Sequence, residues 1–207
     1  MTIWDDIAGE RRQLADVLEG LTEVQLSEPS LCDGWTIKDT AAHLTTTFHT
    51  SMPKFMVQML MSGGFNNANR KAAIREASHR SISDIVEELR ANAEHRFTPP
   101  GMGAEAPLAD IVMHGQDIRR PLAIERDIPE GEARVILDLL VSKKGKFAWP
   151  RGGVGGLRFE ATDMEWSSGS GPLVSGDAEA LLMAIGGRVD AVEDLTGDGV
   201  GELRARF

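Results

Sequence analysis

The sequence predicts a mainly α-helical protein, with a helical bundle over residues 1–150 and a small α+β domain over residues 151–207. Three observations support this prediction. Apolar residues recur at helical spacing through most of the first part, and glycines become frequent after Trp149-Pro150. Residues 156–162 then alternate between apolar and polar, as a half-buried strand does. The change of pattern near residue 150 gives the expected domain boundary.

The composition is that of an ordinary folded protein, with 42% hydrophobic and 26% charged residues in 207. The 22 basic and 32 acidic residues give a net charge of -10. This balance repels phosphate backbones and anionic lipid heads, so we expect neither nucleic acid nor a membrane as partner. The acidic start of the chain does not resemble a signal peptide, and no stretch approaches the ~18 apolar residues of a membrane span. We therefore expect a cytoplasmic protein.

Cap residues and apolar spacing predict the helices of the bundle. One helix should begin after Thr36, because its hydroxyl and Asp39 form a capping-box pattern, and should run through His43 to about Thr50. The other helices are expected over residues 4–21, 70–95 with an interruption near 81–83, 107–120 and 130–141.

The C-terminal part should combine short strands with one helix. After the strand at 156–162, a second strand is expected at Leu173-Val174 and an alanine-rich helix over residues 177–185. The turn at Gly197-Asp-Gly199 should lead into a final strand that ends near Phe207.

The helix expected over residues 107–120 has one polar face that can bind a metal. On a helical wheel Asp110, His114 and Asp117 fall within an arc of roughly 60°. Asp110 and His114 are four residues apart, so their side chains can meet over one site, and a carboxylate with an imidazole suits a metal such as zinc. Asp117 can hold the His114 ring from behind. The alternative is a solvated helix face with an ordinary ion pair.

His43 is the candidate third ligand. Apolar residues form one stripe of its helix, whereas His43 lies beside threonines on a face that is polar but nearly uncharged. Such a face suits a wet pocket better than bulk solvent. Alternatively, His43 is bonded to a threonine hydroxyl or to Asp39. The other histidines, at 49, 79 and 95, are expected on the surface.

The single cysteine, Cys32, excludes an intrachain disulfide and a cysteine-based zinc knuckle. We interpret it as a small buried hydrophobe in a loop rather than a reactive thiol. Other familiar catalytic patterns are absent from the sequence, including a Gly-x-Ser-x-Gly elbow and a phosphate loop.

Three segments carry a family resemblance. Leu21-Thr…Pro29-Ser-Leu-Cys-Asp-Gly-Trp-Thr-Ile-Lys-Asp-Thr-Ala-Ala-His-Leu44 resembles the N-terminal signature of the mycothiol-dependent maleylpyruvate isomerase family, which belongs to the DinB-like superfamily of metal-binding four-helix bundles. His114-Gly-Gln-Asp-Ile-Arg-Arg-Pro-Leu122 resembles its second signature, and residues 161–199 resemble its small C-terminal domain.

The resemblance implies the same three ligands as the helical wheel. The histidine of the Ala-Ala-His-Leu run matches His43, and the carboxylate and histidine of one helix match Asp110 and His114. The implied cofactors are a divalent metal, zinc first, and mycothiol. This chain departs from the family pattern at one position. The isomerase looks as if it has a Glu-x-x-x-His arrangement, whereas this chain has the shorter Asp110 in place of the glutamate. We expect that change to weaken metal binding or to favour another divalent ion.

The expected function is that of a metal- and mycothiol-dependent transferase or isomerase. A metal with three protein ligands and one open position can activate a low-molecular-weight thiol for attack on a small electrophile. Two alternatives stay open. One is a metal-dependent hydrolase, with water in the open position. The other is a non-catalytic small-ligand-binding protein with a degenerate metal site, because of the shorter Asp110.

Overall fold

The computed structural model describes residues 2–49, 65–148 and 154–207. Backbone contacts divide the chain into two compact units, one of residues 1–98 with 110–125 and one of residues 99–109 with 126–207. The sequence-based boundary near residue 150 lies outside the described residues and stays a prediction.

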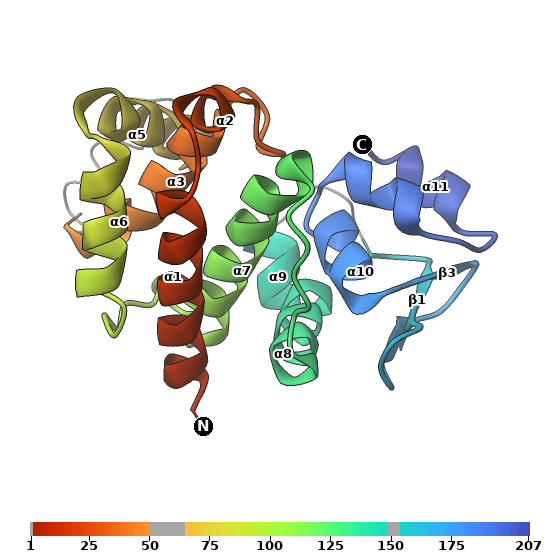
Figure 1. The fold of residues 1–207 in the computed structure, drawn as a ribbon. Helices are drawn as coiled ribbons and strands as arrows, with labels where there is room; N and C mark the ends of the chain where they lie inside the picture. Colours follow the sequence, from red (N-terminus) through yellow and green to blue (C-terminus); the bar gives the residue numbers. More distant parts are fainter. Residues whose placement is uncertain (1, 50–64, 149–153) are drawn as a thin grey trace. The chain divides into compact units, whose positions relative to one another are not determined.

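Helices α1 (Ile3–Glu19) and α6 (Ile82–Ala91) pack against each other in the first unit (Figure 1). Both begin at capping boxes. At the start of α6 the hydroxyl of Ser81 accepts the N–H of Asp84 at 3.1 Å, and the Asp84 carboxylate accepts the N–H of Ser81 at 3.0 Å. This cap satisfies first-turn amides that would otherwise lack partners. It explains why the long stretch from 70 to 95 is interrupted near residue 81, as the sequence predicts.

Helix α3 (Ile37–Thr45) packs against α2 (Glu23–Ser27), α5 (Phe65–His79) and α6. It begins at the expected capping box, in which the Thr36 hydroxyl donates to Asp39 at 2.8 Å. The α-helical hydrogen bonding ends earlier than expected, because residues 46–48 form the 3-10 helix η1 (Thr46–Phe48). Its apolar stripe, as predicted, lies in the core: Ile37, Ala41 and Leu44.

Helix α7 (Glu105–Arg119) contributes its residues from Asp110 onward to the first unit. It begins close to the expected Pro107, which lies in its first turn. The 3-10 helix η2 (Arg120–Leu122) follows, with Pro121 inside it, and the chain turns at Ala123 with φ of 52°.

The second unit combines a three-stranded sheet with helices, so the mainly α fold with a small C-terminal α+β part is confirmed. The sheet has the order β2 (Ser167–Gly169), β1 (Arg158–Ala161), β3 (Leu173–Gly176). Strand β1 pairs antiparallel with β2 and parallel with β3, and Phe159 lies opposite Val174 in the parallel register. Both side chains are buried.

Helices α8 (Glu130–Val141) and α10 (Ala178–Ile185) pack against each other in this unit, and α10 also contacts β1 and β3. The short helix α9 (Lys143–Ala148) follows α8. A buried Trp166 fixes the turn before β2, because its indole N–H donates to Asp138 of α8 at 2.9 Å. The bounds of α8 and α10 agree with the helices expected from the sequence.

The final strand predicted near the C-terminus is wrong. The 3-10 helix η3 (Val189–Asp194) and the helix α11 (Val200–Arg204) occupy this part of the chain. A helix places Val200 and Leu203, three residues apart, on one face, whereas a strand would put them on opposite faces. Leu203 is fully buried. Burial of this helical face therefore explains why residues 200–204 form a helix rather than the strand expected after the turn.

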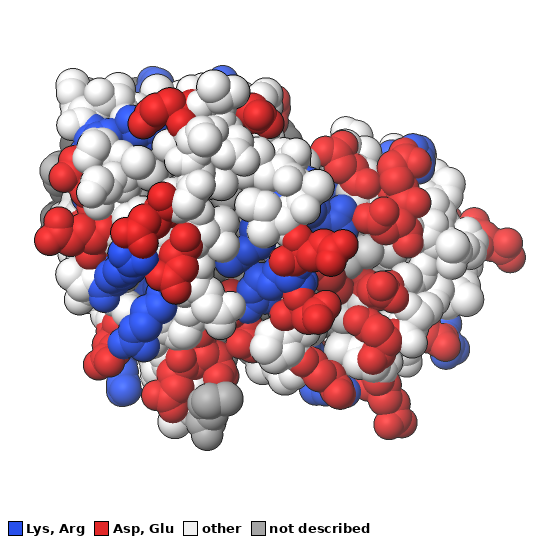
Figure 2. All heavy atoms as spheres, viewed as in Figure 1, with Lys and Arg blue, Asp and Glu red and all other residues white. Residues whose placement is uncertain are grey.

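Charged side chains of both signs cover α1 and α6 on the face drawn in Figure 2. Arg90 pairs with Asp16 at 2.6 Å and with Glu19 at 2.8 Å, and Arg12 pairs with Glu94 at 2.9 Å. Exposed pairs of this kind add little stability. None of the helices in the described ranges has the length and apolarity that crossing a bilayer requires.

Packing between α1 and α6 predicts a stability effect. Leu89 of α6 is fully buried, so Leu89→Ala should lower the free energy of unfolding of the first unit by about 2–5 kcal/mol. Urea denaturation followed by helical circular dichroism measures this loss. Val24→Ala, at a side chain 74% exposed, is the control and should stay within about 0.5 kcal/mol of the wild type. An unchanged midpoint for Leu89→Ala would show that this core is wrongly assigned.

Candidate metal centre

Three side chains from two helices converge in the first unit. His43 comes from α3, and Asp110 and His114 lie one turn apart on α7. The Oδ1 atom of Asp110 lies 3.8 Å from Nε2 of His43 and 3.6 Å from Nε2 of His114. One ligand atom from each residue lies within 4.8 Å of the other two. The structure therefore brings together the three residues that the sequence selected.

These distances suit a shared cation better than direct hydrogen bonds. An N–H···O hydrogen bond measures about 2.7–3.2 Å, so separations of 3.6 and 3.8 Å are too long. In a tetrahedral zinc site with bonds of about 2.0–2.1 Å, two ligand atoms lie about 3.3–3.4 Å apart. The observed gaps exceed that value by only a few tenths of an ångström. Two imidazole nitrogens and one carboxylate oxygen can thus hold a divalent ion and leave a fourth position open.

The two imidazoles are enclosed, whereas the carboxylate is more open. The side chains of His43 and His114 are 11% and 15% exposed, and that of Asp110 is 37% exposed. The two rings meet edge to face with centroids 4.9 Å apart. Trp35 packs beside both, with centroid distances of 5.0 Å to His43 and 6.1 Å to His114. An added ligand would therefore approach from the side of Asp110.

The other ring nitrogen of His114 faces a buried polar pair. Nδ1 of His114 lies 2.8 Å from Oδ2 of Asp117, which is fully buried. Sγ of Cys32 lies 3.0 Å from the same oxygen and 3.4 Å from Nδ1. These three residues also offer metal-ligand atoms, but they are already at hydrogen-bonding distances. Their arrangement therefore favours a support for the ring over a second cation site.

Among the described residues, the His43 ring has no hydrogen bond to a threonine hydroxyl or to Asp39, although the Thr46 hydroxyl donates to the His43 backbone carbonyl at 2.7 Å. The Asp39 carboxylate accepts the N–H and the hydroxyl of Thr36 in the helix cap. The Thr40 hydroxyl donates to Ser30 at 2.7 Å. Nδ1 of His43 is buried and has no hydrogen-bond partner among the described residues. In the described part of the chain, the polar contact of the His43 ring is that of Nε2 with Oδ1 of Asp110, at 3.8 Å.

The electrostatics of the centre favour a charged carboxylate and a charged ring. Burial raises the pKa of Asp110, but the neighbouring His43, His114 and Arg11 outweigh it, so this pKa lies below its ordinary value. Burial lowers the pKa of His114, but Cys32, Asp117 and Asp110 together raise it well above its ordinary value. A metal ion that binds the ring of His114 must therefore displace a proton, so metal binding should strengthen as pH rises.

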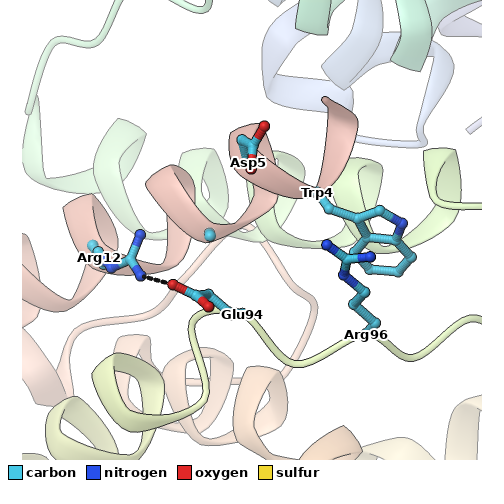
Figure 3. A pocket seen from close by; sticks show the side chains of 6 residues that line it. Trp4, Asp5, Arg12, Glu94 and Arg96 are labelled. Carbon is cyan, nitrogen blue, oxygen red and sulfur yellow. Dashed lines mark hydrogen bonds and ion pairs between the residues drawn. The ribbon is translucent and has the colours of Figure 1, made fainter. Parts of the chain in front are cut away.

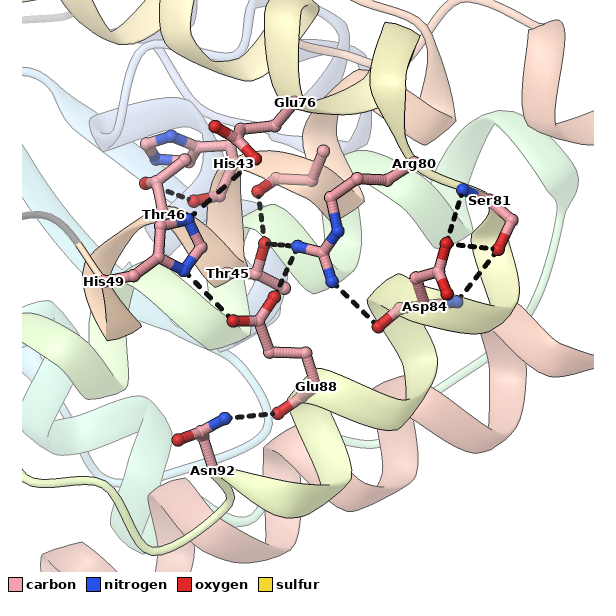
Figure 4. A network of polar contacts seen from close by, with 11 residues as sticks. His43, Thr45, Thr46, His49, Glu76, Arg80, Ser81, Asp84, Glu88 and Asn92 are labelled. Atoms are coloured by element: carbon pink, nitrogen blue, oxygen red, sulfur yellow. Dashed lines mark hydrogen bonds and ion pairs between the residues drawn. The ribbon is translucent and has the colours of Figure 1, made fainter.

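A polar network holds the end of α3, which carries His43 (Figure 4). Arg80, after α5, donates to the Thr45 hydroxyl at 3.2 Å and pairs with Glu88 of α6. Glu88 also lies 3.0 Å from Nδ1 of His49. Because these contacts join α3 to the segments around α5 and α6, they fix the helix end next to His43.

Sequence reasoning missed two neighbours of the centre, Cys32 and Trp35. Cys32 was expected to be only a small buried hydrophobe, but it is half-buried and hydrogen bonded to Asp117. Both residues lie in the loop directly before α3. Their closeness in sequence to the start of that helix is the one feature of the sequence that could have indicated that they lie near His43. The remaining histidines take no part in the centre. His49 and His79 are exposed as expected, whereas His95 is half-buried and packs edge-on against Phe48.

A surface pocket elsewhere in the first unit does not include the centre. Its lining is mostly charged, and the Arg96 guanidinium lies over the Trp4 ring at 5.7 Å (Figure 3). Arg12 and Glu94 pair across it. The lining residues are Trp4, Asp5, Ala8, Arg12, Glu94 and Arg96.

Fold and site together define a helical protein with a candidate divalent-metal centre of two histidines and one aspartate. A sequence profile described as "Mycothiol maleylpyruvate isomerase N-terminal domain" matches residues 7–119, which is more than half of the chain. The chain belongs to this family. The matched range contains all four predicted site residues, and it confirms the resemblance drawn from the sequence segments.

Two solved structures resemble this chain. The crystal structure of the mycothiol-dependent maleylpyruvate isomerase shares 17% sequence identity over 96% of both chains, with a TM-score of 0.54. At this identity the likeness concerns the fold alone. A histidine-to-alanine mutant of that isomerase matches with 17% identity over 96% of both chains and a TM-score of 0.42. No curated protein matches the chain.

The convergence of His43, Asp110 and His114 predicts which variants lose metal. His43→Ala and His114→Ala should each bind zinc far more weakly than the wild type, because each removes one of only three protein ligands. Elemental analysis after zinc loading and gel filtration measures the retained metal. His79→Ala, an exposed histidine on α5, is the matched control and should retain the wild-type amount. Full metal in both site variants would eliminate this centre.

Proposed function

We propose that this protein is a metal- and mycothiol-dependent isomerase or S-transferase that acts on a small electrophile. The observation that carries the proposal is the convergence of two imidazole nitrogens on one carboxylate oxygen, at 3.6 and 3.8 Å. Membership of a family described by mycothiol and maleylpyruvate isomerase supports mycothiol as the thiol and isomerisation or thiol transfer as the reaction class.

Each residue of the centre has a distinct part in the proposal. His43, Asp110 and His114 hold the metal, with zinc the first candidate. Asp117 keeps the His114 ring in the orientation and tautomer that present Nε2 to the metal, since it lies 2.8 Å from Nδ1. A divalent ion at this point would lower the pKa of a coordinating thiol, so that the nucleophilic thiolate is available at neutral pH.

The surroundings of the centre suit a thiol that comes from outside the chain. Cys32 lies on the Nδ1 side of His114, whereas the predicted metal lies on the Nε2 side. The ring therefore separates the protein's own thiol from the position where the reacting thiol should bind. Trp35 packs beside both imidazoles and helps to exclude water from the enclosed side.

Direct thiol binding to the metal can be tested by spectroscopy. Cobalt(II)-loaded wild-type protein should gain an intense sulfur-to-cobalt charge-transfer band when mycothiol is added, because the thiolate occupies the open position. His43→Ala should not show the band, and His79→Ala should show it at wild-type intensity.

Turnover separates the proposed reaction class from hydrolysis. Maleylpyruvate consumption by the zinc-loaded protein should require mycothiol and should be lost in His43→Ala. Metal-dependent hydrolysis of small esters or amides without any thiol would instead support a hydrolase. Absence of both the cobalt band and zinc binding would favour the non-catalytic alternative.

A further inference from the structure

We infer that Cys32 is a positioning residue of the metal centre, whose thiol holds the Asp117 carboxylate behind the His114 ring. This inference rests on the proposed metal site and adds to it a residue outside the three ligands. It gives the only cysteine of the chain a role that involves neither ligation nor nucleophilic attack.

The contact geometry assigns this role. Oδ2 of Asp117 is approached both by Nδ1 of His114, at 2.8 Å, and by Sγ of Cys32, at 3.0 Å. When a metal occupies Nε2, Nδ1 carries the ring proton and can only donate. The thiol then donates to Oδ2, which lies 3.0 Å from Sγ. One carboxylate oxygen thus receives two donors, one from α7 and one from the loop before α3.

The Asp117 carboxylate depends on these two donors because it is buried. Asp117 is fully buried, and a buried carboxylate needs hydrogen-bond donors to stay charged and fixed. The loop is itself tied to the same residue, because the N–H of Leu31 donates to the backbone carbonyl of Asp117 at 3.1 Å. The Ser30 hydroxyl accepts the N–H of Cys32 at 3.2 Å. The backbone N–H groups of Leu31 and Cys32 are therefore both hydrogen bonded, and these bonds hold the loop and its thiol against Asp117.

The geometry argues against a nucleophilic role for this thiol. In a cysteine–histidine–carboxylate nucleophile, the sulfur and the carboxylate occupy different ring nitrogens, so that one orients the base that serves the other. Here both lie against Nδ1 of His114. The sulfur and the carboxylate consequently support the same side of the ring and leave Nε2 to the metal centre.

The test compares zinc affinities of variants at the support, measured by competition with a chromophoric chelator. Asp117→Asn sets the scale and should weaken zinc binding by about 10–100-fold. Cys32→Ala should weaken it by about 10-fold, at the lower end of that range, since Asp117 keeps its other contacts. Cys32→Ser keeps a donor of similar size and should restore affinity close to that of the wild type. Asp33→Ala, at the exposed neighbour in the same loop, is the control and should match the wild type.

Three results would overturn the inference. They are wild-type affinity in Cys32→Ala, affinity in Cys32→Ser as weak as in Cys32→Ala, and a sulfur-to-cobalt band in the cobalt protein without added thiol. The last would make Cys32 a ligand. Thermal unfolding of the metal-free variants accompanies each measurement, and the serine rescue separates donation from packing. His43→Ala distinguishes the two failures: if it binds zinc like the wild type, the metal site itself is wrong, whereas its loss of zinc confines a negative result to Cys32.

Discussion

The fixed orientation of the His114 ring is the constraint on which the rest of the centre depends. Asp110 precedes the ring by one helical turn and faces Nε2, and Asp117 follows by three residues and faces Nδ1. Both carboxylates belong to α7, so this helix supplies a polar partner for each nitrogen of the ring. The other elements only have to bring their groups to this helix. Helix α3 brings His43, and the loop before it brings Cys32.

The approach of α3 is determined by ordinary packing rather than by the site. Its apolar stripe is buried, its N-terminus is capped by Thr36 and Asp39, and its C-terminal end is held by Arg80. An isolated bridge between Pro29 and Thr36 closes the preceding loop. Two imidazoles and a carboxylate are therefore held together by contacts that lie outside the site. In this arrangement the ligand atoms lie 3.6 and 3.8 Å apart, beyond the usual length of a hydrogen bond.

Local patterns predicted most of the helices, and together with the family resemblance they selected the three residues that converge in the structure. The capping boxes at Thr36 and Ser81 and the spacing of Asp110 and His114 are short-range features, so the sequence expresses them directly. The strand expected at the C-terminus failed because Val200 and Leu203 fit a short helix whose burial depends on tertiary packing. The same limit hid the role of Cys32. Its position before α3 was visible, but its contact with Asp117 joins residues 85 positions apart and needs the fold.

The shorter Asp110 was the sequence feature that most favoured a degenerate site, and the geometry weakens that argument. One methylene fewer than in glutamate withdraws the carboxylate, yet Oδ1 still lies within a few tenths of an ångström of the spacing that a tetrahedral ion requires. Asp110 is also the most exposed of the three side chains, so it has more room than the enclosed rings to adjust. The distance from metal to ligand differs from one divalent ion to another. A difference of a few tenths of an ångström in ligand spacing should therefore change which ion binds best more readily than it prevents metal binding. Under the proposed function, we therefore expect the shorter side chain to change which divalent ion the centre prefers rather than to abolish binding.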